Sequence, residues 1–115
     1  MLHVKIKYRK DTREASLLLS GHAGQAEAGR DIVCASASIL AYTAAQIVAA
    51  MESHGDLTSP PTVKLDSGNA EISCVSRNDD TYAELLYMLF VIGMGYKLLA
   101  KNYPQYIELT IDAEA

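Results

Sequence analysis

A chain of 115 residues with 50% hydrophobic and 21% charged residues has the size and composition of one soluble globular domain. Its net charge of -4 argues against non-specific binding to nucleic acid or to an anionic membrane, because phosphate contacts require clustered Lys and Arg. The first ten residues alternate charged and apolar side chains without the continuous apolar core of a signal peptide. We therefore expect a cytoplasmic protein with two reduced cysteines.

The first half of the chain predicts two strands, a loop and a long helix. Apolar and polar residues alternate over 2–8 and 15–20, which is typical of half-buried strands. The segment 20–30 contains three glycines and no apolar period, so we expect a functional loop. Asp31 suits the N-cap of a helix from about Ile32 to Ser53, with Gly55 at its C-terminus. This helix is rich in small residues that let it lie close to a sheet, and five of its side chains fall near one face: Ile32, Ala35, Ile39, Tyr42 and Gln46.

The second half predicts a hairpin, a second long helix and a final strand. The hairpin pairs 62–66 with 70–75 around the turn Ser67-Gly68-Asn69. The second helix should begin near Asp79 or Asp80 and run to about Lys101, with an apolar stretch of 12 residues (85–96) that favours a buried helix over a membrane span. Its core stripe is expected to hold five residues: Leu85, Met88, Leu89, Ile92 and Leu99.

The element order is therefore ββαββαβ, in a single domain over residues 1–115. Strand residues alternate instead of forming continuous apolar runs, which indicates an antiparallel or mixed five-stranded sheet. Two long helices should cover at least one of its faces, so the fold class is α+β.

Cys34 is the residue with the strongest chemical signal. With Asp31 as N-cap, Cys34 lies in the first helical turn, where unpaired N–H groups and the helix dipole stabilise a thiolate. The nearby Asp31 carboxylate opposes a second negative charge. Spacing alone is equally consistent with a small buried apolar cysteine, since free cysteine is among the most buried residue types.

His22 is the candidate base for Cys34. It precedes the cysteine by twelve positions, in a glycine-containing loop that ends where the helix starts. A lone loop histidine is more often simply solvated. Cys74 shares its strand parity with apolar residues and should be a core residue, while His54 should cap a helix. The His and Cys positions have no zinc-site spacing, and we expect neither metal nor cofactor.

Two segments carry a resemblance to a known family. Gly21-His22-Ala23-Gly24 followed by Gly29-Arg30-Asp31-Ile32-Val33-Cys34-Ala35, then Ser38 and Leu40, resembles the signature of the Prp ribosomal-processing cysteine proteases. The late segment 102–107, Asn-Tyr-Pro-Gln-Tyr-Ile, is similar to the C-terminal segment of that family. The resemblance extends over essentially the whole chain.

The resemblance implies a catalytic dyad of Cys34 as nucleophile and His22 as general base and acid. It also implies a homodimer and a substrate, the N-terminal extension of large-subunit ribosomal protein twenty-seven. Asp31 would cap the helix or orient His22, and Gly21, Ala23, Gly24 and Gly29 would form a substrate loop. Gln25 and Ala28 are smaller than the side chains that the family pattern leads us to expect, which bears on substrate preference.

Two other functions stay open from the sequence. A non-catalytic assembly factor could use the same cleft to bind a ribosomal protein. A thiol-redox protein is the weaker alternative, because the chain has no Cys-x-x-Cys pair. Truncation of the partner protein distinguishes a protease from a binding module.

Overall fold

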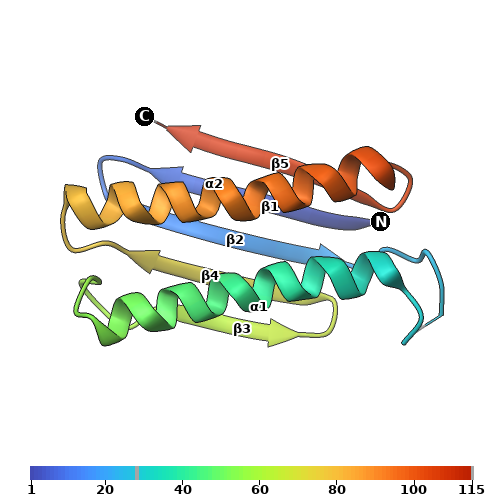
Figure 1. Ribbon diagram of the computed structural model, residues 1–115, viewed down its shortest axis with the longest axis horizontal. Helices are drawn as coiled ribbons and strands as arrows, with labels where there is room; N and C mark the ends of the chain where they lie inside the picture. The colour runs from blue at the N-terminus through green and yellow to red at the C-terminus, as the bar shows by residue number, and fades with distance from the viewer. Residues whose placement is uncertain (28, 115) are drawn as a thin grey trace.

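The computed structural model describes residues 1–27 and 29–114, and this part of the chain forms five strands and two helices in the predicted order (Figure 1). One sheet holds all five strands in the order β3-β4-β2-β1-β5. β1 pairs parallel to β5, and the other pairs are antiparallel, so the sheet is mixed and the α+β prediction is confirmed. The bounds are β1 Leu2–Arg9, β2 Glu14–Gly21, α1 Ile32–Ser53, β3 Thr62–Asp66, β4 Asn69–Val75, α2 Asp79–Asn102 and β5 Ile107–Glu114.

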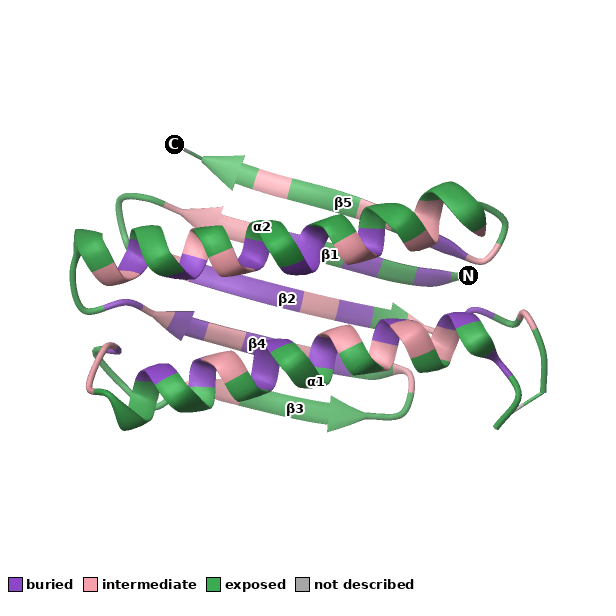
Figure 2. Ribbon diagram, viewed as in Figure 1, coloured by how far each residue is buried: buried purple, intermediate pink, exposed green. Residues whose placement is uncertain are grey.

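Both helices lie on the same face of the sheet (Figure 1). Alternate residues of the central strands point into the layer between sheet and helices, as the alternation of buried and exposed segments in Figure 2 shows. Val4 and Leu17 are each only 1% exposed, whereas His3 and Lys5 on the opposite face are exposed. The period-two pattern in the sequence therefore predicted the inner face correctly.

Small residues bring α1 onto the sheet. Its buried face consists of Val33, Ala37, Ala41, Ala44, Ala45, Val48 and Met51. The five residues that the sequence placed near one face, from Ile32 to Gln46, are all exposed instead. The packed face is the alanine-rich one, because short side chains allow the helix backbone to approach the strands. Ile32, Ile39 and Tyr42 are on the solvent side of the same helix.

α2 begins at Asp79, as predicted, but its cap was not foreseen. Asn78 is the N-cap: its side chain accepts from the Thr81 N–H at 2.9 Å, in a capping box completed by the Thr81 hydroxyl. The two acidic residues, Asp79 and Asp80, lie in the first turn, where their negative charges interact favourably with the helix dipole, but neither of them caps the helix. Leu85, Leu89 and Ile92 of the predicted core stripe are buried.

The outer face of α2 is exposed, whereas the apolar stretch in the sequence predicted a buried helix. Five large apolar residues along one stripe are exposed: Tyr87, Phe90, Val91, Met94 and Leu98. By length and composition both α1 and α2 could cross a membrane, with about a third of each apolar window buried (33% and 28%). One face of each helix packs on the sheet, so the prediction of a buried helix holds only for the sheet-facing side of α2.

Candidate active site

Cys34 lies in the first turn of α1, as the sequence predicted. Its backbone N–H donates to Oδ1 of Asp31 at 2.9 Å, and its Sγ accepts from the Ala23 N–H at 3.4 Å. The residue is only partly buried. The sulfur therefore has a polar hydrogen-bond donor and access to solvent, two conditions that a reactive thiol requires.

Asp31 is the N-cap of α1, which confirms the capping role. Besides the Cys34 N–H, it accepts from the Gln25 N–H at 3.0 Å through Oδ2. Burial raises the pKa of its carboxyl, but the hydrogen bonds from the Cys34, Gln25 and Ala26 N–H groups and the Cys34 side chain outweigh burial and hold the pKa below its usual value. Both carboxylate oxygens are thus engaged in fixing the loop and the helix start.

His22 directly follows the last residue of β2. Gly21, predicted to belong to the loop, closes that strand with a φ of 88° and donates its N–H to the Gly68 carbonyl at 3.0 Å. A side chain at position 21 would collide with the Met1 carbonyl oxygen, at 2.5 Å from its Cβ. The strand end therefore fixes the backbone from which His22 projects.

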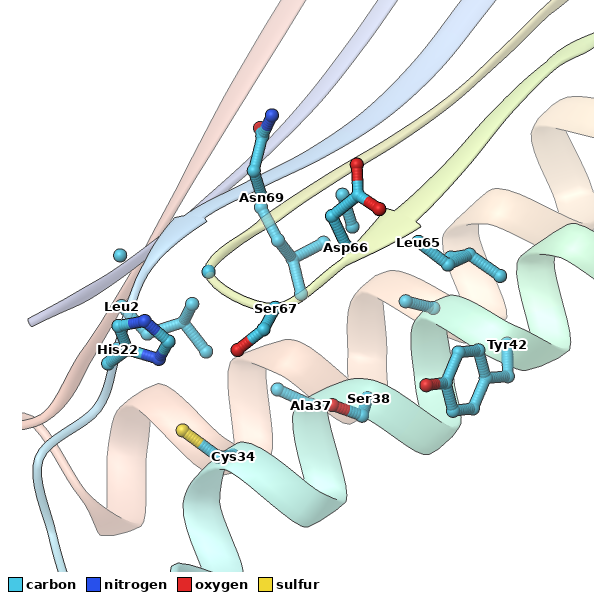
Figure 3. Close-up of a pocket in the computed structure, with 15 residues that line it drawn as sticks. Leu2, His22, Cys34, Ala37, Ser38, Tyr42, Leu65, Asp66, Ser67 and Asn69 are labelled. Carbon is cyan, nitrogen blue, oxygen red and sulfur yellow. The ribbon is translucent and has the colours of Figure 1, made fainter. Parts of the chain in front are cut away.

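A pocket of about 300 Å³ contains both His22 and Cys34. Figure 3 shows the imidazole of His22, the sulfur of Cys34 and the hydroxyl of Ser67 converging on one side of it. α1 supplies one wall with Ala37, Ser38, Ala41 and Tyr42, and the β3–β4 hairpin supplies the opposite wall with Leu65, Asp66, Ser67, Gly68, Asn69 and Ala70. The structure thus brings together the two residues that the sequence predicted as a dyad.

The hairpin wall was missing from the sequence-based site. The turn Ser67-Gly68-Asn69 was visible in the sequence as a turn, but no local pattern related it to His22, which lies 46 positions earlier. The pairing of β4 with β2 brings the turn to the end of β2. Tertiary structure alone gives these residues a place in the pocket.

The predicted substrate loop contributes less to the pocket than expected. Gly21 lines the pocket, whereas Ala23, Gly24 and Gly29 are not among the residues that line it in the described part of the chain. Ala23 is buried and reaches the site through its backbone N–H. Gly24 and Gly29 both have positive φ with open space around the Cα. Ala28 lies outside the described residues.

The remaining His and Cys residues do not line the pocket. Cys74 is 5% exposed in β4, and burial raises the pKa of its thiol to about 11, which confirms its core role. His3 pairs with Glu108 on the exposed sheet face, and the backbone of His54 caps α1. Within residues 1–27 and 29–114, no three His, Cys, Asp or Glu side chains are grouped to hold a metal ion.

Comparison with known proteins adds to this geometry. The family model described as cysteine protease Prp matches residues 1–108. The ribosomal processing protease Prp from Staphylococcus aureus, solved with a covalently linked product peptide, is 26% identical with a TM-score of 0.72, over 97% of this chain and 100% of that one.

Two further structures share the fold. SMU.848 from Streptococcus mutans is 27% identical with a TM-score of 0.68, over 99% of this chain and 96% of that one. The Staphylococcus aureus protease with a substrate peptide gives a TM-score of 0.63 at 23% identity, over 97% and 100% of the two chains, which supports the fold alone. Curated protein sequences gave no match. Because the family model spans nearly the whole chain, this protein belongs to the Prp family of cysteine proteases.

Proposed function

We propose that this cysteine protease acts through a dyad of Cys34 as nucleophile and His22 as general base and acid, and that it removes the N-terminal extension of large-subunit ribosomal protein twenty-seven. The observation that supports this dyad is that both residues line the same pocket. Cys34 comes from the start of α1 and His22 from the end of β2, and both line one cavity with solvent access. The alternative thiol, Cys74, is buried in the core.

The proposed reaction begins when the imidazole of His22 accepts the proton of the Cys34 thiol. The thiolate then attacks the carbonyl carbon of the scissile peptide bond, and a pair of carbonyl electrons moves onto oxygen. Collapse of this adduct breaks the C–N bond while His22 gives its proton to the leaving amine. Water, deprotonated by His22, next attacks the thioester, and release of the acid product returns the proton to sulfur.

The oxyanion needs hydrogen-bond donors near Cys34. Two N–H groups of the helix start are already engaged, because Cys34 donates to the Asp31 carboxylate and Ala35 donates to the Asp31 carbonyl at 3.0 Å. The Ala23 N–H donates at 3.4 Å to Sγ, a weak acceptor that becomes weaker once it bonds to the carbonyl carbon, so this N–H can turn to the oxyanion beside the sulfur. We therefore assign the Ala23 N–H as the candidate oxyanion donor, in place of the N–H groups of Cys34 and Ala35.

The substrate assignment is supported by the solved relative, whose description is that of a ribosomal processing protease. The pocket is open between α1 and the β3–β4 hairpin, so that an extended peptide can lie along the helix past Cys34. The net charge of -4 suits a basic partner through complementary electrostatics. Family membership favours this function over the non-catalytic binding module.

The test is to incubate the purified protein with ribosomal protein twenty-seven that carries its N-terminal extension, and to follow the intact mass of that partner. We expect loss of one N-terminal fragment and an unchanged remainder. A partner that stays at full mass while it co-purifies with the protein would identify a binding module. Cleavage of unrelated extended peptides at equal rates would refute the substrate assignment and leave the protease activity intact.

We also propose a homodimer, formed through the outer face of α2. Its exposed stripe includes Phe90, Val91 and Met94, and a contiguous apolar face of this kind is typical of an interaction surface. A twofold axis lets one such stripe cover its copy. Light scattering should give twice the monomer mass, and Val91→Asp should give the monomer. A monomeric wild-type protein at micromolar concentration would contradict the proposal.

A further inference from the structure

The turn between β3 and β4 touches the imidazole of His22. A Cβ placed on Gly68 would lie 2.7 Å from Nε2 of His22 and 3.1 Å from Cε1. Separations below 3.0 Å do not occur for real Cβ atoms, so the ring occupies the space that any side chain at this position would need. The absence of a side chain at Gly68 is what allows the ring its present position.

The backbone around His22 is fixed on both sides of the residue. Before it, the Gly21 N–H donates to the Gly68 carbonyl at 3.0 Å; after it, the Ala23 N–H donates to Cys34 Sγ at 3.4 Å. With Nε2 against the turn, the other ring nitrogen, Nδ1, lies on the edge of the imidazole that faces Cys34 in Figure 3. The strand end and the helix start fix the backbone of His22, and the turn limits where its imidazole can lie.

We propose that Gly68 is a positioning residue for the general base: its bare Cα leaves room for the Nε2 edge of His22 against the turn, so that Nδ1 faces Cys34. This inference rests on the proposed dyad and adds a third element, the β3–β4 turn, to the active site. Gly68 does not contact the reacting atoms. It acts through the rotamer of His22, and a base displaced by about 1 Å can lose on the order of 100-fold in rate.

A methyl group at position 68 should move the imidazole while the fold survives. The imidazole is the movable end of a side chain and His22 is exposed, so the ring can rotate away without opening the core. The remaining cost is the positive φ of 74°, which disfavours any residue with a Cβ. Gly55 offers a matched control, since its φ is 76° and a Cβ there would meet only Arg77 Nη1, at 4.0 Å. Gly55 follows the C-terminal end of α1, whereas Cys34 lies at the N-terminal end of this helix.

The experiment compares peptide cleavage by wild type, Gly68→Ala, Gly55→Ala and His22→Ala. For Gly68→Ala we expect kcat to fall about 100-fold with little change in KM, because a displaced base affects the chemical step. Gly55→Ala should retain wild-type kcat with a similar loss in melting temperature. Should Gly68→Ala fail to fold, Gly68→Asn carries the same Cβ and tolerates positive φ better, so the comparison still applies.

A second measurement follows the alkylation rate of Cys34 by iodoacetamide as a function of pH. Because His22 assists formation of the thiolate, both Gly68→Ala and His22→Ala should shift the pH at which Cys34 alkylation reaches half its maximal rate, and both in the same direction. Adding Gly68→Ala to His22→Ala should change nothing further, since the residue that the turn positions is already gone. An equal effect of Gly68→Ala in both backgrounds would show that the turn does not act through His22.

The outcomes separate this proposal from the dyad itself. Wild-type kcat in Gly68→Ala together with an inactive His22→Ala would overturn the positioning role and keep the dyad. Full activity of His22→Ala would overturn the dyad, and the positioning role with it. A large fall in kcat for both Gly68→Ala and Gly55→Ala would attribute the loss to backbone strain and refute the specific contact.

Discussion

The two cysteines of this protein have the same side chain in opposite environments. Cys34 is partly exposed at the start of a helix, with a backbone N–H donating to its sulfur. Cys74 is buried in the second strand of the β3–β4 hairpin, where burial raises the pKa of its thiol to about 11. Reactivity of a thiol depends on its thiolate fraction and its access to solvent. Position in the fold, and not residue type, therefore decides which of the two can act as a nucleophile.

The largest expected effect is on catalysis. Cys34→Ala and Cys34→Ser should each reduce peptide cleavage by a factor of about 10⁴ or more, since removal of a nucleophile has effects of this order. Cys74→Ala should keep activity. Circular dichroism and melting curves serve as the control for folding. Cleavage at the wild-type rate by Cys34→Ala would reverse the comparison between the two thiols.

Alkylation compares the same two thiols without a substrate. In the folded protein near neutral pH, iodoacetamide should modify Cys34 at least about 100-fold faster than Cys74, because burial both protects Cys74 and suppresses its thiolate. Peptide mapping over time measures the two rates. In denaturant the two cysteines should react at comparable rates. Faster modification of Cys74 in the native state would contradict both its burial and the reactivity of Cys34.

Alkaline pH should reveal Cys74 through stability. Its folded-state pKa of about 11 lies above the ordinary value of 9.0, so the unfolded chain loses this proton first as pH rises. Stability from the buried neutral thiol is complete below pH 9 and declines between pH 9 and 11 by about 2 kcal/mol. Denaturant titrations of wild type and Cys74→Ala isolate this component, because Tyr96 and the other groups titrate in both. If the unfolding free energies of wild type and Cys74→Ala changed in parallel between pH 9 and 11, Cys74 would not be desolvated in the folded state.

The smallest expected effect concerns the helix start that holds Cys34. Asp31→Ala removes the acceptor of two backbone N–H groups and should cost about 1 kcal/mol of unfolding free energy, whereas Asp31→Asn keeps the cap and should cost less. Urea titrations give both values. Because Cys74 is buried and remote from this cap, its alkylation rate should change in both variants only by the amount that the loss of unfolding free energy accounts for. A larger loss in Asp31→Asn than in Asp31→Ala would argue against capping.

The sequence by itself determined the element order and the chemistry of the candidate nucleophile. Period-two alternation gave the inner face of the strands, because each strand has one buried side. Asp31 three residues before Cys34 predicted the first-turn position that the structure confirms. These features depend on residues close together in the chain, whose spacing fixes their geometry.

Only the tertiary structure decided which face of α1 packs and what surrounds His22. An alanine-rich face and a face of large apolar residues both fit a helical period, and the sheet selects the alanines because it needs close approach. Gly68 joins the site only because β4 pairs with β2, which brings a distant turn against the imidazole. Contacts of this kind join segments far apart in the chain, and no local pattern records them.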